Sequence, residues 1–199
     1  MSQHRYALSL TATLDRLDYN LSQQVALLRK MDRNSRSFWV LNTLTRIFEI
    51  IGSAATTIPA TLLLTIWHAD NPSVASVFLN ATILQAFNTG VTAVVKGLVR
   101  RERPAYSQNG DMYLTKWVDI YSFPSGHALQ MVTLSRFVYI YMADPVLKMC
   151  LIALSGTITF LRVFTGRHFL GDVMGGCVLG WYMVSLYTSL CWVDSTQFF

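Results

Sequence analysis

Three stretches of this chain are long enough and apolar enough to cross a lipid bilayer. They are residues 47–67, 74–95 and 173–193, and together they contain a single charged side chain, Glu49. Each reaches or exceeds the about 20 residues that a helix needs to cross a hydrocarbon core of about 30 Å. Because a backbone in lipid must satisfy its own hydrogen bonds, these stretches predict membrane-spanning helices rather than a soluble fold.

Two shorter apolar segments, residues 127–143 and 146–165, lie between the second and third stretches. Asp144 and Pro145 separate them. A turn-forming aspartate followed by a proline predicts a tight helical hairpin at this point. The sequence therefore predicts an all-α integral membrane helical bundle with about five transmembrane helices.

The first 36 residues have a different pattern. Leucine and valine recur at three- and four-residue spacing, with charged residues between them, at positions 10, 14, 17, 21, 25 and 28. This spacing predicts an amphipathic helix. Two placements fit it equally well, on the membrane surface or against the cytosolic end of the bundle. We therefore divide the chain into an N-terminal amphipathic interfacial arm, residues 1–36, and a transmembrane domain, residues 37–199.

Positive charge is distributed unevenly over this topology. Of the 16 Lys and Arg residues, all but Arg136 and Lys148 lie on or next to the face that carries the N-terminal arm and the loops 97–126 and 166–171. The positive-inside rule places that face in the cytosol. Sidedness thus accounts for the net charge of +5, and no nucleic-acid partner is needed. A cytosolic Asn20 stays unglycosylated, although Asn20–Ser22 is an acceptor pattern.

Three polar clusters, far apart along the chain, are brought to this face by the order of the helices: Lys96 and Arg103; Ser125, Gly126 and His127; Arg162, His168 and Asp172. Arginines bind phosphate oxygens through forked hydrogen bonds, and N–H groups at a helix start add donors. His168 and Asp172 have the four-residue spacing that brings side chains together on a helix. A carboxylate that holds one imidazole nitrogen leaves the other as a nucleophile or base. The clusters together predict an oxyanion-binding catalytic site.

Each cluster also has a simpler explanation. Juxtamembrane basic residues commonly mark only topology and lipid headgroups, which fits Arg100 and Arg101 as well as catalysis does. Pro-Ser-Gly is an ordinary helix-start turn. A His–Asp pair is half of a metal site, but no Cys or Glu cluster completes it, so no metal is predicted. The conjunction of all three clusters on one face favours the catalytic interpretation.

The clusters resemble the type-2 phosphatidic acid phosphatase superfamily. Its patterns Lys-x6-Arg-Pro, Pro-Ser-Gly-His and Arg-x5-His-x3-Asp match residues 96–104, 124–127 and 162–172. Leu161 stands where the family usually has a serine, at a position that is not a phosphate ligand. Within the superfamily, "KGLVRRERPA", "YSFPSGHA", "GRHFLGDV" and the late "CW" look closest to the polyisoprenoid diphosphate phosphatases, including those of presqualene diphosphate. The resemblance covers residues 41–192.

The resemblance implies a metal-independent phosphatase of lipid phosphates that needs no cofactor. In this scheme His168 is the nucleophile that forms a phosphohistidine, Asp172 orients its ring, and His127 is the general acid and then the general base. The phosphoryl oxygens are held by the remaining residues: Lys96, Arg103, Ser125, Gly126 and Arg162. The implied substrates are farnesyl, geranylgeranyl or presqualene diphosphate, with the corresponding monophosphates. The implied location is the endoplasmic reticulum or nuclear envelope, with the active site facing the cytosol.

Two alternatives accompany this reading. One is a broad-specificity phosphatase of phosphatidate, lysophosphatidate or sphingosine phosphate, and the other is a catalytically inactive membrane scaffold of the same fold. The intact site residues disfavour the scaffold. The oligomeric state is left open.

Three further residues in the apolar segments have structural interpretations. Arg136, inside a predicted span, should face the bundle interior in an ion pair, for which Glu49 is the candidate partner. Gly176 and Gly180 form a small-xxx-small face that predicts close helix packing.

Overall fold

All the regular structure in the computed structural model of this chain is helical. The structure describes residues 2–26, 30–106 and 120–193, with side chains from residue 12 onward. These residues form seven α helices and no strand, in this order: α1 (Ser2–Val25), α2 (Arg36–Ile51), α3 (Ala54–Trp67), α4 (Pro72–Val99), α5 (Gly126–Tyr141), α6 (Pro145–Phe164) and α7 (Leu170–Leu190). The all-α fold class predicted from the sequence is confirmed.

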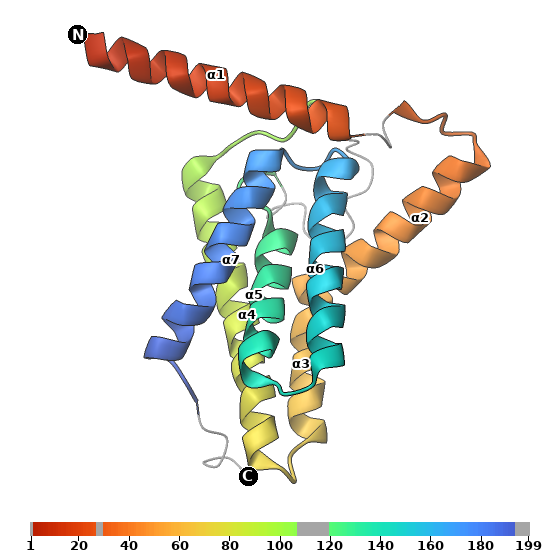
Figure 1. The fold of residues 1–199 in the computed structure, drawn as a ribbon, viewed down its shortest axis with the longest axis vertical. Helices are drawn as coiled ribbons and strands as arrows, with labels where there is room; N and C mark the ends of the chain where they lie inside the picture. The colour runs from red at the N-terminus through yellow and green to blue at the C-terminus, as the bar shows by residue number, and fades with distance from the viewer. Residues whose placement is uncertain (1, 27–29, 107–119, 194–199) are drawn as a thin grey trace.

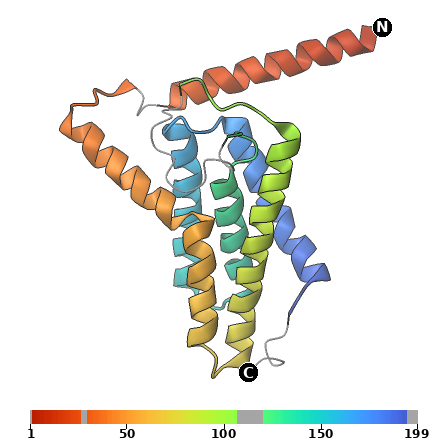
Figure 2. The same ribbon diagram turned by 180° about the vertical axis from the view of Figure 1, so that it is seen from behind.

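Helix α5 forms the centre of the bundle. It packs against α4, α6 and α7, while α3 packs along α4. Figure 1 shows α1 crossing one end of this bundle, and Figure 2 shows from behind that α2 leans away from the other helices at that same end. Leu129, Met131 and Phe137 of α5 are almost completely buried. This short helix is therefore surrounded by protein on several sides.

The number of membrane spans depends on whether α2 and α3, which meet at an angle, are counted together as one span. Among the described residues, α4, α6 and α7 are each long and apolar enough to cross a membrane. Helices α2 and α3 qualify only together, as a pair bent by 49°, which would make four spans. Helix α5 has 16 residues, fewer than the about 20 that a straight span needs. The count of five spans therefore stays a prediction.

The predicted span at residues 47–67 is broken rather than straight. Gly52 ends α2, and Ser53 precedes α3. A Cβ atom added at Gly52 would lie 2.8 Å from the Cδ1 atom of Ile158 in α6, so glycine permits the close approach of α6 at the bend. The bend follows directly after Glu49, which lies in the last turn of α2.

The helical hairpin predicted at Asp144 and Pro145 is confirmed. The Asp144 carboxylate accepts hydrogen bonds from the N–H groups of Val146 and Leu147 at 2.8 and 3.2 Å. Pro145 is the first residue of α6, where its missing N–H costs nothing. The chain therefore turns sharply from α5 into α6, and the two helices pack side by side.

Helices α5 and α7 approach each other with their backbones nearly in contact. A Cβ atom added at Gly176 would lie 2.6 Å from the carbonyl oxygen of Ser125, and one added at Gly180 would lie 2.6 Å from that of Leu129. Small residues permit such close packing between helices in membranes. The predicted packing role of the two glycines is confirmed, and it fixes the starts of α5 and α7 next to each other.

Helix α1 contacts the bundle through its C-terminal half. Val25 packs against a small core cluster that α5, α6 and α7 contribute, as the second of the two predicted placements requires. Leu14, Leu17 and Leu21 remain 55%, 51% and 48% exposed. The side chain of Leu10 and all of Leu28, which belong to the same pattern, lie outside the described part of the chain.

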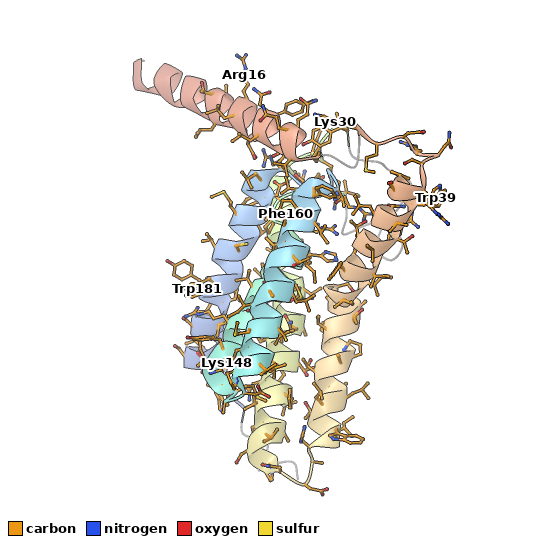
Figure 3. All side chains as sticks on the ribbon, turned by 45° about the vertical axis from the view of Figure 1, so that its right-hand side comes forward. Arg16, Lys30, Trp39, Lys148, Phe160 and Trp181 are labelled. Carbon is orange, nitrogen blue, oxygen red and sulfur yellow. The ribbon has the colours of Figure 1, made fainter. Side chains whose placement is uncertain are left out.

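Charged side chains in Figure 3 follow the predicted asymmetry. Arg16 lies on α1 and Lys30 lies shortly after its end, at one end of the molecule, whereas Lys148 lies toward the opposite end. The division at residue 36 and the cytosolic placement of the α1 end stay predictions.

The predicted pairing of Arg136 with Glu49 is wrong. The Arg136 guanidinium donates hydrogen bonds to the carbonyl of Trp181 and, at 2.8 Å, to the hydroxyl of Ser185. It also lies over the Trp181 ring, 4.3 Å from the centroid, a favourable cation–π contact. Trp181 is itself 54% exposed. Arg136 is thus held against α7, and Glu49 belongs to a different set of contacts.

Candidate active site

The three polar clusters meet at the end of the bundle that α1 crosses. Lys96 lies in the last turn of α4, and Ser125 directly precedes α5. Arg162 lies in the last turn of α6, directly before the turn that leads to His168 and Asp172 at the start of α7. All five side chains are buried. The fold therefore gathers the predicted cationic, hydroxyl and imidazole groups into one enclosed region.

The turn between α6 and α7 depends on Gly166. Its φ angle is +72°, a conformation that glycine adopts without the strain that a Cβ would cause. The aromatic ring of Tyr106 would lie 3.0 Å from an added Cβ. This turn carries Arg167 and His168 away from α6 and toward the centre of the site.

The ring of His168 is held by a backbone carbonyl. Its Nδ1 lies 2.9 Å from the carbonyl oxygen of Ser122. A carbonyl only accepts hydrogen bonds, so Nδ1 carries the proton, and a neutral ring then has its lone pair on Nε2. Ser122, fully buried, was not among the residues expected from the sequence, although it lies two residues before the Pro-Ser-Gly-His pattern. The Ser122 carbonyl thus fixes the orientation of the His168 ring, and the role of His168 as nucleophile stays a prediction.

Asp172 lies near His168 but is bound more directly by other groups. Its Oδ2 is 3.7 Å from Nδ1 of His168, beyond hydrogen-bonding distance. The same oxygen accepts the N–H of Phe169 at 2.9 Å, and Oδ1 accepts from Arg101 at 2.7 Å. His168 precedes α7, so the four-residue spacing does not place the two side chains on one helical face. That Asp172 orients the ring stays a prediction, with an electrostatic rather than a hydrogen-bonded contact as its basis.

Arg101 is a site residue that the sequence left undecided. It binds the fully buried Asp172 carboxylate, and its guanidinium also reaches Asp18 of α1 at 2.8 Å. Burial by itself lowers the pKa of Arg101, but the hydrogen bond with Asp18 and the charge of Asp172 outweigh burial and raise that pKa above its ordinary value. Arg101 is therefore a permanent cation that links Asp172 of the site to Asp18 of α1, and not a marker of topology alone.

The segment after α4 is tied to the segment before α5. The N–H of Ser122 donates to the carbonyl of Arg101 at 2.8 Å, and its hydroxyl donates to the carbonyl of Glu102 at 3.0 Å. Arg103 donates to the carbonyl of Arg167 at 3.0 Å. These contacts bring the first two clusters next to the turn that carries His168.

Glu49 also lies at the site, although the sequence predicted Arg136 as its partner. Its carboxylate accepts from Arg162 at 3.0 Å and also pairs with Arg167. Its backbone carbonyl lies 3.0 Å from Nε2 of His127. A single residue of α2 thus contacts three side chains of the site.

Three buried polar atoms in this region have no hydrogen-bond partner among the described residues: the hydroxyls of Ser125 and Thr92 and the Nε of Arg162. Buried donors without partners are costly, and at a functional site they indicate a ligand with acceptor oxygens. Thr92 lies one helical turn before Lys96, and a Cβ added at Gly126 would lie 3.4 Å from its methyl group. Thr92 was not expected from the sequence, and its four-residue spacing from Lys96 is the feature that could have indicated it.

The kinds of side chain gathered at the site determine which ligands it can bind. Among the described residues, no three His, Cys, Asp or Glu side chains are grouped so that they could hold a metal ion. The groups that gather are instead cations, hydroxyls and imidazoles, which bind oxyanions.

Comparison with known proteins assigns the chain to a family. The sequence model of the PAP2 superfamily matches residues 74–195, which is more than half of the chain. The chain belongs to the PAP2 superfamily. All eight site residues predicted from the sequence lie inside the matched range, whereas Asp18 and Glu49 lie outside it.

Two solved structures share this fold. One is the transmembrane PAP2 type phosphatidylglycerolphosphate phosphatase of Bacillus subtilis, with a TM-score of 0.63, 19% identity, and coverage of 89% of this chain and 85% of that chain. The other is LpxE of Aquifex aeolicus, with a TM-score of 0.59, 20% identity, and coverage of 84% and 93%. With its membrane-length helices, this PAP2 chain is an integral membrane protein.

Proposed function

We propose that this PAP2 chain is a lipid phosphate phosphatase that hydrolyses polyisoprenoid diphosphates without a metal. The observation that carries the proposal is the set of unpaired buried donors, on Ser125, Thr92 and Arg162, beside an imidazole whose Nδ1 is engaged. A phosphoryl group supplies the acceptor oxygens that these donors lack. Polyisoprenoid diphosphates are proposed because the motif sequences resemble those of the phosphatases that act on them.

In the first step, Nε2 of His168 attacks phosphorus, and the bond between phosphorus and the leaving oxygen breaks. His127 gives its proton to that oxygen as a general acid. Lys96, Arg103 and Arg162, with the Ser125 hydroxyl and the Gly126 N–H, hold the three phosphoryl oxygens while charge shifts in the transition state. The product is a phosphohistidine. The lipid chain stays in the bilayer because the site lies at the end of the spanning helices.

In the second step, water attacks the phosphohistidine. His127 now takes a proton from the water as a general base. The bond between phosphorus and Nε2 of His168 breaks, inorganic phosphate leaves, and the ring returns to its neutral form. The Ser122 carbonyl accepts the hydrogen bond from Nδ1 throughout both steps, which holds the ring in one orientation.

A second candidate substrate class is favoured by the similar solved structures. One of them is named as a phosphatidylglycerolphosphate phosphatase, so glycerolipid phosphates belong beside prenyl diphosphates in any assay. Sphingosine phosphate tests the same broad-specificity alternative.

The proposed function is tested by phosphate release from a panel of lipids. Purified protein in detergent or vesicles is given farnesyl, geranylgeranyl and presqualene diphosphates, their monophosphates, phosphatidate and sphingosine phosphate, with EDTA present. We expect the highest kcat/KM for the diphosphates and no loss on adding EDTA, since the cationic side chains neutralise the phosphoryl group. Preference for phosphatidate would instead support the second class. Activity that EDTA removes and magnesium restores would contradict the mechanism.

Glu49 gives rise to a prediction about affinity. Its carboxylate already occupies Arg162 and Arg167, so an incoming phosphoryl group must compete with it. Glu49→Gln keeps the backbone carbonyl that contacts His127 and removes the competing charge. We expect the inhibition constant of vanadate, a phosphoryl mimic, to fall about 10-fold, the effect of one contact of about 1.4 kcal/mol.

The control for this variant is Asp70→Asn, which removes a charge from an exposed residue in the turn between α3 and α4. It should leave vanadate inhibition unchanged. Weaker inhibition of Glu49→Gln would mean that Glu49 positions the arginines for phosphate rather than competing with it.

We further propose that the end of the bundle crossed by α1 faces the cytosol, in the endoplasmic reticulum or nuclear envelope. The uneven distribution of Lys and Arg supports the orientation, and the resemblance to polyisoprenoid diphosphate phosphatases supports the organelle.

A further inference from the structure

Helix α1 caps the start of α7 from outside. The carboxylate of Asp18 accepts the N–H of Gly171 at 2.9 Å, and the hydroxyl of Ser22 accepts the N–H of Leu170 at 2.8 Å. Ser22 also donates to Asp18 at 3.2 Å. The first N–H groups of a helix have no partners within that helix, and a carboxylate there is favoured by the helix dipole.

The start of α7 caps itself only in part. Asp172 accepts the N–H of Phe169 at 2.9 Å, whereas the N–H groups of Leu170 and Gly171 find their acceptors on α1. Asp18 and Ser22 are four residues apart on α1, so one face of that helix presents both capping groups. Helix α1 therefore provides the side-chain acceptors for the first N–H groups of α7. In most helices, a serine, threonine or aspartate directly before the helix provides them.

A single arginine links this contact to the site. Arg101 donates to Asp18 at 2.8 Å and to Asp172 at 2.7 Å. Its guanidinium also lies over the ring of Phe169, 4.3 Å from the centroid. The planar fork of an arginine can bind two carboxylates at once in fixed geometry. Asp172 is fully buried and Asp18 has a side chain only 17% exposed, so both contacts are shielded from solvent.

We propose that Arg101 is a positioning residue of the active site, and that Asp18 of α1 acts through Arg101 on Asp172. The seating of α1 on the bundle then controls how the start of α7, with Asp172 and the preceding His168, is held. This inference rests on the proposed phosphatase function, because the positioned groups are those of that reaction.

Asp15 provides the matched comparison on the same helix. Its carboxylate is also near Arg101, but at 3.7 Å, and its side chain is 76% exposed. Exposed ion pairs contribute little. The geometry therefore assigns the effect to Asp18, although both residues carry the same charge and lie one turn apart.

A double-mutant cycle tests the relay. We expect Arg101→Ala to lower kcat about 100-fold, as small displacements of catalytic groups do, and Asp18→Ala to lower it about 10-fold. KM should change little, because neither side chain belongs to the proposed phosphate ligands. If Asp18 acts through Arg101, the double variant should match Arg101→Ala alone. Asp15→Ala should behave as wild type. Asp18→Asn, of the same size, replaces Asp18→Ala if that variant does not fold.

A second measurement reports the seating of α1 without any enzymatic activity. Val25→Cys is introduced after Cys150, Cys177 and Cys191 are replaced by alanine, and its labelling by a polyethylene glycol maleimide is timed. Val25 packs on the bundle, so labelling should be slow, and Asp18→Ala should accelerate it several-fold while Asp15→Ala does not.

These outcomes separate the two proposals. An inactive wild-type protein that still shows the labelling difference would overturn the phosphatase function and leave the docking contact standing. An active protein in which the effects of Asp18→Ala and Arg101→Ala multiply in the double variant would overturn the relay. Equal effects of Asp15→Ala and Asp18→Ala would overturn it as well.

Discussion

Replacing His168 by alanine is expected to abolish phosphate release, with kcat lowered roughly 10⁵-fold or more. The reason is that Nε2 of His168 is the atom to which phosphorus is transferred in the proposed mechanism. The hydrogen bond from Nδ1 to the Ser122 carbonyl fixes the ring, and alanine offers no atom that could accept the phosphoryl group in its place. Steady-state phosphate release by the purified variant is the measurement.

Two further variants make the His168 result specific. His168→Asn retains a donor for the Ser122 carbonyl and should fold like wild type, yet remain inactive. His68→Ala removes an imidazole at the other end of α3, where His68 stacks on Phe78, and should keep full activity. Acid-labile, base-stable labelling by a phosphate-labelled substrate should appear in the wild type and vanish in both His168 variants. Substantial turnover by His168→Ala would refute the nucleophile.

Replacing Gly176 by valine is expected to remove both stability and activity. An added Cβ would lie 2.6 Å from the carbonyl oxygen of Ser125 and 3.2 Å from the Cβ of Ala128. The nearest atom is backbone and cannot turn aside, so α5 and α7 must separate at that level. The N–H of Ser125 donates to the carbonyl of Asp172 at 3.0 Å, and this link between the start of α5, where we propose that phosphate binds, and the start of α7 would be lost.

The expected size follows from overpacking of a tight contact, which costs about 3 kcal/mol in severe cases. For a chain of this length that lowers the thermal midpoint by roughly 10 °C, and we expect activity to fall at least about 100-fold because the site is split. The control is Gly156→Val in α6, where an added Cβ meets nothing within 4 Å. A Gly176→Val protein with normal activity and midpoint would show that α5 and α7 can move apart without consequence.

Much of the architecture could be predicted because its causes are local. Apolar length predicted membrane helices, the Asp144–Pro145 pair predicted the turn into α6, and the spacing of Gly176 and Gly180 predicted close packing. Each rests on the chemistry of neighbouring residues on one segment. The family, too, followed from short motifs, and the match over residues 74–195 confirmed it.

The partners of the charged residues could not be predicted in this way. Glu49 was matched with Arg136 because both stood out in apolar segments. The bend after α2 instead brings Glu49 to Arg162 and Arg167, and α5 turns Arg136 toward α7. An ion pair depends on a separation of a few ångströms, which the bend angle and helix packing set.

The sequence by itself determined that this chain is a helical membrane protein and which residue types gather at one end of it. Only the tertiary structure decided how they are joined: Ser122 holds His168, and Arg101 links Asp172 to Asp18 of α1. The physical reason is the distance along the sequence over which each interaction acts. Helix formation and membrane insertion depend on residues a few positions apart, whereas Asp18, Arg101 and Asp172 are brought together by the close packing of helices that are distant in sequence.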